Sequence, residues 1–147
     1  YILKGRRYLR ITQEADYAIR IIYILSTSGT KCDAKTISDI VKVPVRFTLK
    51  ILRKLLQCGL VSSIKGAGGG YILKKQPSEI SLKDVIEAVN GPIQISKCLC
   101  DEHLCTRVYD KKDECSFHKV FVDINEKLNE DFESVTFDQL IKEKEKV

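Results

Sequence analysis

The chain has 147 residues, of which 44% are hydrophobic and 31% charged, so it can pack a core of about one domain and is not expected to be wholly disordered. No apolar run approaches the roughly 18 residues of a membrane-spanning helix. The low aromatic share of 7% argues against a protein that binds single-stranded nucleic acid by stacking its bases on rows of aromatic rings. The net charge of +5 is divided unevenly: residues 1–75 carry +11 and residues 76–147 carry −6. The basic half is expected to meet a polyanion, unless its lysines serve only solubility.

The first element that the sequence predicts is a helix from Gln13 to about Leu25. Thr12 precedes it as a capping residue, and apolar residues recur within it at helical spacing. Residues 1–8 show no clear period and do not begin with Met. We expect them to be a leader or an expression remnant outside the fold.

Two further helices are predicted to follow closely. Asp33 is placed to cap a short helix over residues 34–41, and a third helix is predicted from Pro44 to Cys58. A helix, a short helix, a turn and a longer helix form the order of a helix-turn-helix unit.

The third predicted helix has two contrasting faces. Its apolar arc contains Phe47, Ile51, Leu52, Leu55 and Leu56. Its opposite arc contains Arg46, Lys50, Arg53, Lys54 and Gln57. A basic stripe of this kind suits phosphates and the base edges of a major groove, although on an isolated helix it would more simply be a solvated face.

A β-hairpin is predicted next. Residues 60–64 and 71–73 form its strands, and the glycine-rich segment 65–70 forms its tip. The tip lacks the Lys-Ser/Thr pair and the following helix of a P-loop, which argues against a nucleotide cradle. Helix-turn-helix and hairpin together predict a winged helix for duplex DNA. Its candidate contact residues are Arg46, Thr48, Lys50, Arg53, Lys54, Lys65, Gly66 and Gly68.

The rest of the chain predicts a short helix after Ser81 and a long helix from about Ser116, followed by a last helix that Thr136 caps. The long helix carries one apolar stripe of Phe117, Val120, Phe121, Ile124, Leu128 and Phe132. This stripe is a candidate dimer seam, with packing on the chain's own first helix as the alternative.

The fold class expected is therefore mainly α with a small β-hairpin: a winged helix-turn-helix domain plus a long C-terminal dimerisation helix. We divide the chain into a DNA-binding domain over residues 9–90, a cysteine-rich loop over residues 91–115, and the dimerisation and C-terminal helices over residues 116–147.

Four of the six cysteines are clustered. Cys98, Cys100, Cys105 and Cys115 lie within 18 residues, and His118 follows them. A cytoplasmic DNA-binding chain sits in a reducing compartment, which argues against disulfides. The cluster could bind an iron–sulfur centre, bind zinc or react with oxidants, and the spacing alone does not separate these. No acid–base constellation surrounds the two histidines, so an enzyme is not expected.

Several segments resemble one known family. They are LRITQEADYAIR, VPVRFTLKILRKLLQCGLVSSIKGAGGGYIL, ISLKDVIEAVNGP, CSFH and VTFDQL. Taken together they are similar to the IscR/NsrR-type bacterial transcriptional regulators (the Rrf-two family) over nearly all of residues 9–141. The resemblance implies a homodimer that is crossed through the long helix and binds pseudopalindromic, double-stranded promoter DNA. Whether it acts as an activator or as a repressor stays open.

The resemblance also implies an iron–sulfur cluster. Cys98, Cys105 and Cys115 match the family's three cysteines, although the gaps here are six and nine residues rather than the usual five. Cys100 is an alternate middle ligand, and the fourth ligand is His118 or the partner subunit's Asp16. The cluster type, 2Fe-2S or 4Fe-4S, stays open. It would sense iron–sulfur supply, redox state or nitric oxide.

The alternatives are a cluster-free regulator of the same fold, which responds to a thiol oxidant, a metabolite or a partner protein, and an iron–sulfur redox carrier.

Overall fold

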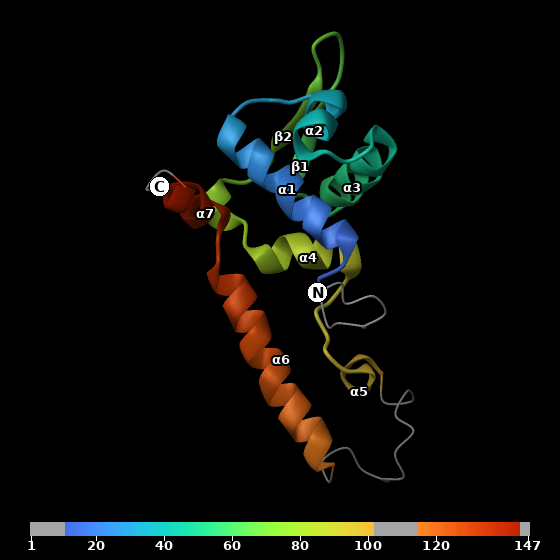
Figure 1. Cartoon of the computed structure of the whole chain (residues 1–147), viewed down its shortest axis with the longest axis vertical. Coiled ribbons are helices and arrows are strands. Elements are labelled where there is room, and N and C mark those ends of the chain that lie inside the picture. Colours follow the sequence, from blue (N-terminus) through green and yellow to red (C-terminus); the bar gives the residue numbers. More distant parts are fainter. Residues whose placement is uncertain (1–10, 102–114, 145–147) are drawn as a thin grey trace, which may run out of the picture.

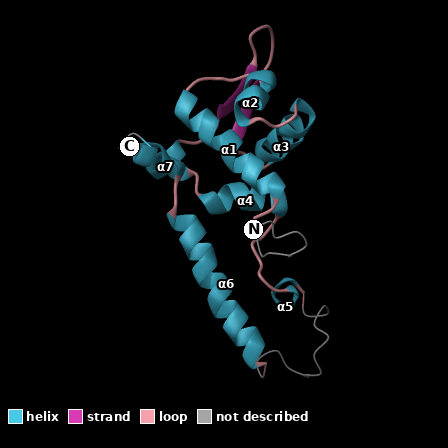
Figure 2. Cartoon of the chain, viewed as in Figure 1, coloured by secondary structure: helices cyan, strands magenta, loops and turns pink. Residues whose placement is uncertain are grey.

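The computed structural model describes residues 11–101 and 115–144. It is mostly helical with one two-stranded antiparallel hairpin, as the sequence predicts (Figure 1). Figure 2 shows a head of packed helices with the hairpin at one end, and a long helix that projects from the other end. None of the helices in the described ranges is long and apolar enough to cross a membrane.

The head is built around α1 (Gln13–Ser28), which contacts the four other head helices. Thr12 caps it as predicted, because its hydroxyl accepts a hydrogen bond from the Ala15 amide. The helix ends at Gly29, whose φ of +60° is a left-handed conformation that glycine adopts without strain. The buried side chains of α1 form the centre of the core: Ala15, Ala18, Ile21, Ile22 and Leu25.

The helix-turn-helix unit consists of α2 (Ala34–Val41) and α3 (Val45–Gln57). Asp33 caps α2 by accepting hydrogen bonds from two backbone amides of its first turn. Pro44 stands at the cap position of α3, one residue before the place that the sequence predicts for it. This confirms the predicted order of elements, with a shift of one residue at that boundary.

The hairpin pairs β1 (Val61–Ile64) with β2 (Gly70–Leu73). The backbone of Cys32 extends it, because its amide and carbonyl both bond to Tyr71. A side chain at Gly70 would place its Cβ 2.7 Å from the Cys32 carbonyl oxygen, so only glycine fits there. The hairpin is thereby fixed to the segment that leads into α2.

The head is completed by α4 (Leu82–Asn90) and α7 (Phe137–Lys144), with the short helix η1 (Pro77–Glu79) between the hairpin and α4. Ser81 and Asp84 cap α4 reciprocally. The side chain of Phe137 is fully buried, and α7 contacts α1. The last helix therefore belongs to the core of the head, although the division by sequence groups it with the long helix.

The projecting part contains α5 (Lys97–Cys100) and α6 (Ser116–Ser134), which contact each other. The sequence shows no sign of α5. No residue of α6 is buried, and its apolar side chains Phe117, Val120 and Ile124 are 59%, 53% and 48% exposed. Only its C-terminal end, at Phe132, packs against the core of the head.

Candidate functional site

The outer face of α3 carries the charges that the sequence places there. Arg46, Lys50 and Arg53 are exposed along its length. The opposite face is buried in the head through Thr48, Ile51, Leu52 and Leu55. Packing therefore fixes the helix, while its basic face stays open to a ligand.

Lys54 lies at the edge of this face and is engaged within the protein. Its ammonium group donates a hydrogen bond to the Val89 carbonyl at 2.7 Å and pairs with Glu14 at 2.9 Å. Lys50 lies 3.3 Å from the same carboxylate but remains 60% exposed. Partial burial raises the pKa of Glu14, but the two ammonium groups outweigh this and bring its pKa below the ordinary value.

Thr48 and Phe47 of α3 differ from their predicted burial: Thr48 is buried and Phe47 is exposed. Thr48 is fully buried, and its hydroxyl donates to the Val43 carbonyl at 3.3 Å, so it is not part of the outer face. Phe47, expected in the core, is 42% exposed, and the Arg46 guanidinium lies 4.8 Å from the centre of its ring. Phe47 thus supports a basic side chain by a cation–π contact.

The wing tip is shaped by glycines. Gly66 and Gly68 have φ values of +100° and +74°, which other residues rarely adopt, so their role in the tip is to permit its backbone turn. Lys65 is exposed beside them. The Lys31 ammonium lies 3.9 Å from where a Cβ of Gly68 would be. The sequence analysis missed Lys31 because it is remote from the tip along the chain.

The cysteines of interest lie at the far end of α6 from the head. Cys98 in α5 and Cys115 at the cap position of α6 are both buried, while Cys100 is exposed. The Sγ of Cys98 is 3.2 Å from the Ser96 hydroxyl. Cys105, a predicted ligand, lies outside the described residues. The structure therefore places two of the three predicted cysteines in neighbouring elements.

The two candidates for the fourth ligand have different surroundings. The Nδ1 atom of His118 is buried and has no hydrogen-bond partner among the described residues. Asp16 lies in the head and pairs with Arg20 at 2.7 Å. Within residues 11–101 and 115–144, no three His, Cys, Asp or Glu side chains form a metal-binding group. Even so, two buried thiols and an unpaired imidazole nitrogen suit a soft metal centre.

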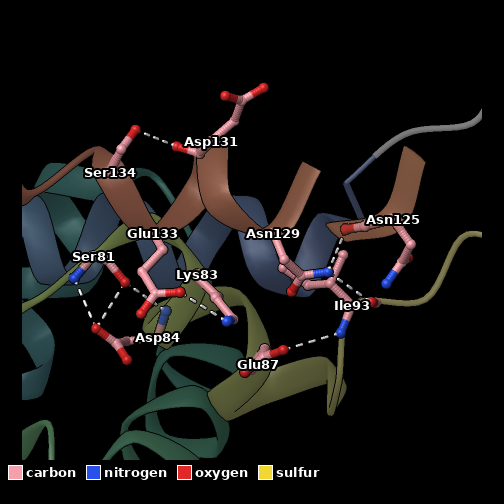
Figure 3. Close-up of polar contacts among 10 residues, drawn as sticks. All are labelled: Ser81, Lys83, Asp84, Glu87, Ile93, Asn125, Asn129, Asp131, Glu133 and Ser134. Carbon is pink, nitrogen blue, oxygen red and sulfur yellow. Dashed lines mark hydrogen bonds and ion pairs between the residues drawn. The ribbon is translucent and has the colours of Figure 1, made fainter. Parts of the chain in front are cut away.

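Two asparagines of α6 hold the segment that leads into α5, as Figure 3 shows in part. The side-chain amide of Asn129 donates to the Ile93 carbonyl at 3.3 Å. The side-chain Oδ1 of Asn125 accepts a hydrogen bond from the Ile95 backbone amide at 3.0 Å. The Ile93 amide donates to Glu87 of α4 at 3.2 Å. We call these contacts the asparagine clamp. Sequence analysis missed it, although the four-residue spacing of the asparagines places them on one helix face.

A second contact joins the two parts of the molecule nearer the head. Lys83 of α4 pairs with Glu133 of α6 at 3.0 Å (Figure 3). Its ammonium donates a hydrogen bond to that carboxylate, which raises the pKa of Lys83. The long helix is therefore tied to α4 both beside the head and at the clamp.

Comparison with known proteins agrees with this architecture. Residues 11–143 match the family model Rrf2, described as an iron-dependent transcriptional regulator. An rrf2-like HTH-type transcriptional regulator of Rhodobacter capsulatus is 32% identical over 121 residues, which are 78% of this chain and 80% of that protein. The regulator IscR of Pectobacterium atrosepticum is 26% identical over 139 residues, covering 93% and 82% of the two chains.

Among solved structures, that of CymR, the global cysteine regulator of B. subtilis, has a TM-score of 0.74 at 24% identity. The match covers 90% of this chain and 96% of that one. This likeness supports the winged-helix fold. The family and these relatives are transcriptional regulators and not enzymes, and regulators of this family bind DNA, typically as dimers. With its residues 11–143 matched throughout, the chain belongs to the Rrf2 family of transcriptional regulators.

Proposed function

We propose that the chain is a homodimeric regulator that reads duplex promoter DNA with α3 and the wing. The observation that carries this proposal is the open basic face of a helix whose other face is fixed in the core. Arg46, Lys50 and Arg53 would meet base edges and phosphates, and Lys65 with Lys31 would meet the backbone beside the groove. Lys54 and Thr48 are left out of this surface because their side chains are engaged within the head.

The second copy of the chain is proposed to cover the apolar face of α6. Phe117, Val120 and Ile124 are about half exposed and lie on one side of the helix. An isolated chain would leave this stripe in water. A second α6 crossing it would bury both stripes at once and would set the distance between the two DNA-reading helices.

We further propose that the far end of α6 holds an iron–sulfur cluster. Cys98 and Cys115 would supply two thiolates and Cys105 or Cys100 the third, with His118 or the partner subunit's Asp16 as the fourth ligand. When bound, such a cluster supplies a centre that oxidants or nitric oxide can alter. Support comes from the two buried thiols and from the unpaired Nδ1 of His118.

The proposed coupling between the cluster end and the DNA surface uses contacts of the described residues. The asparagine clamp ties the segment before α5 to α6 and, through Glu87, to α4. The last turn of α4 in turn receives the Lys54 hydrogen bond at Val89. A change in α5 would therefore shift α4 and α6 together and alter the placement of α3.

The DNA proposal is tested by charge-removing variants in salt titrations of duplex binding. Arg46→Ala should weaken binding by about 1–3 kcal/mol if this side chain reads a base. Lys65→Ala should reduce the salt slope by about one unit, as one lost phosphate contact does. Lys142→Ala, which removes an exposed charge from α7, is the matched control and should change neither. Wild-type binding by both test variants at every salt concentration would contradict the assignment.

The cluster proposal is tested by cysteine variants purified without oxygen. Cys98→Ala and Cys115→Ala should each lose visible absorption and bound iron, whereas Cys58→Ala, at the end of α3, should keep both. Comparing Cys100→Ala with Cys105→Ala identifies the middle ligand, and comparing His118→Ala with Asp16→Ala identifies the fourth. Zinc without iron in the wild-type protein would contradict the proposal.

A cluster-free thiol regulator is the second candidate. It is favoured by the exposed Cys100 and by the likeness to the fold of CymR. In that case mild oxidation, rather than iron loss, would change DNA affinity, and Cys100→Ala would abolish the response.

A further inference from the structure

The outer face of α3 holds exposed apolar side chains that phosphate binding does not explain. Leu49 is 41% exposed and Val45, one turn before it, is 38% exposed. The packing face of α3 is already made by Thr48, Ile51, Leu52 and Leu55. Leu49 and Val45 are therefore not needed to hold the helix in the head.

Leu49 is surrounded by the basic residues of the same face. Arg46 lies three residues before it and Arg53 four residues after it, and at these spacings helical side chains are neighbours. Val45 stands at the same helical spacing from Leu49. Residues 45–50 form the first turns of α3, the part of a recognition helix that reaches base edges. Leu49 thus adjoins two side chains that are proposed to touch DNA, and Val45 extends the apolar surface on its other side.

We propose that Leu49, backed by Val45, contacts the C5 methyl group of a thymine in each half-site of the operator. The inference rests on the proposed function of α3. The thymine methyl is the one apolar group that a base pair presents in the major groove, and apolar side chains are its usual contacts. The arginines would fix the helix in register, and Leu49 would select thymine at one base pair.

The size of the effect follows from the area involved. Burying one methyl-sized group lowers the free energy enough for about a fourfold gain in affinity. Replacing thymine by uracil removes this methyl and leaves every hydrogen-bonding edge unchanged. One thymine per half-site should therefore show a loss of about fourfold with uracil.

The experiment uses the full chain and duplexes that the wild-type protein enriches from a random-sequence library. Each thymine of an enriched duplex is replaced by uracil, and binding is measured for wild type, Leu49→Ala, Leu49→Met and Ile40→Ala. Leu49→Met keeps an apolar contact and should keep the uracil effect. Ile40→Ala removes a 51% exposed apolar side chain from α2 and is the matched control. Circular dichroism confirms that each variant is folded.

We expect one thymine per half-site at which replacement by uracil weakens DNA binding by wild type, Leu49→Met and Ile40→Ala to the same extent. At that position, the replacement should not change DNA binding by Leu49→Ala. If uracil affects Leu49→Ala as it affects wild type at every position, the inference is overturned and the proposed function stands. If the wild-type protein enriches no duplex, the proposed function fails and the inference fails with it.

Discussion

The head and the far end of α6 differ in how completely one chain satisfies them. Among the described residues of the head, 18 buried hydrophobic side chains form a single cluster. Side chains cap α1, α2 and α4. At the far end, α6 buries no residue, and Phe117, Val120 and Ile124 of its apolar stripe are about half exposed. The His118 Nδ1 is buried there without a partner among the described residues. The head buries its apolar side chains and caps its helices with its own residues. The far end leaves apolar side chains exposed and a buried polar atom without a partner among the described residues.

This contrast indicates where each region obtains its stability. In the head, the buried core holds α3 in a fixed position. In the proposed function, the far end would gain order from what binds it: a second α6 along the stripe and a ligand at the cysteines. A regulator benefits from this division, because a signal can act on the incomplete end without unfolding the part that reads DNA.

The largest effect is expected from Ile124→Glu in the stripe of α6. Each copy would lose the burial of an isoleucine, about 1.5–3 kcal/mol, and a symmetric dimer loses it twice. Light scattering should then show a monomer, and operator affinity should collapse. Lys119→Glu, an exposed change on the same helix, is the control and should stay dimeric. A dimeric Ile124→Glu protein would show that another surface holds the two copies together.

Phe137→Ala tests the packing of the head. It would empty a fully buried site in the head and should destabilise the protein by about 3–5 kcal/mol in denaturant unfolding. Because this side chain lies in the head, the loss should be the same for protein with and without bound iron. A loss that depends on iron would mean that the two regions do not fold separately.

Lys54→Ala tests whether Lys54 of α3 stabilises the head. It removes the hydrogen bond to the Val89 carbonyl and the pair with Glu14, so thermal unfolding should reveal a loss of about 1–2 kcal/mol. Arg53→Ala removes an exposed neighbour on the same helix and should leave stability unchanged. Equal stability of the two variants would contradict the structural role given to Lys54.

Asn129→Ala tests the asparagine clamp. Loss of its hydrogen bond to the Ile93 carbonyl should cost about 1 kcal/mol locally and speed amide hydrogen exchange over residues 93–100. Exchange in α1 and α3 should not change. Glu130→Ala, its exposed neighbour in sequence, is the control. Unchanged exchange in Asn129→Ala would show that the clamp does not hold this segment.

The smallest effect concerns pH. The pKa of Glu14 is lowered in the folded protein, so its ion pairs stabilise the head above the ordinary value of 4.5 and this contribution is lost as pH falls through the lowered pKa. Glu14→Gln lacks the contribution at every pH. Urea unfolding should therefore show wild type more stable than Glu14→Gln near neutral pH, with the difference shrinking as the pH falls below the ordinary value of 4.5. A constant difference would contradict the ion-pair role.

Local rules were enough to predict most of the head. Thr12, Asp33 and Ser81 cap helices as expected, because capping depends on a few adjacent residues. Thr48 is buried because it lies at the centre of the packing face, at helical spacing from Ile51, Leu52 and Leu55. Phe47 lies at the border of that face, where only tertiary packing decides whether a side chain is buried. The larger aromatic residue remains outside, where Arg46 covers it.

At the far end of α6, the clustered cysteines predict a site but not its structure. The helix α5 has only four residues, too few to show a helical periodicity in the sequence. The roles of Asn125 and Asn129 depend on a segment about 30 residues away in sequence, which no local pattern indicates. Likewise, the identity of the middle thiol depends on Cys105, which lies outside the described residues.

A ligand at the cysteines beside α6 is proposed to control DNA binding by the head. The most direct test measures operator affinity for one anaerobic preparation of the full chain before and after its iron is removed. We predict a change of about 5–150-fold, the usual range of coupling between two sites, and a Cys98→Ala protein fixed at the iron-free value. Equal affinities with and without iron would contradict the account.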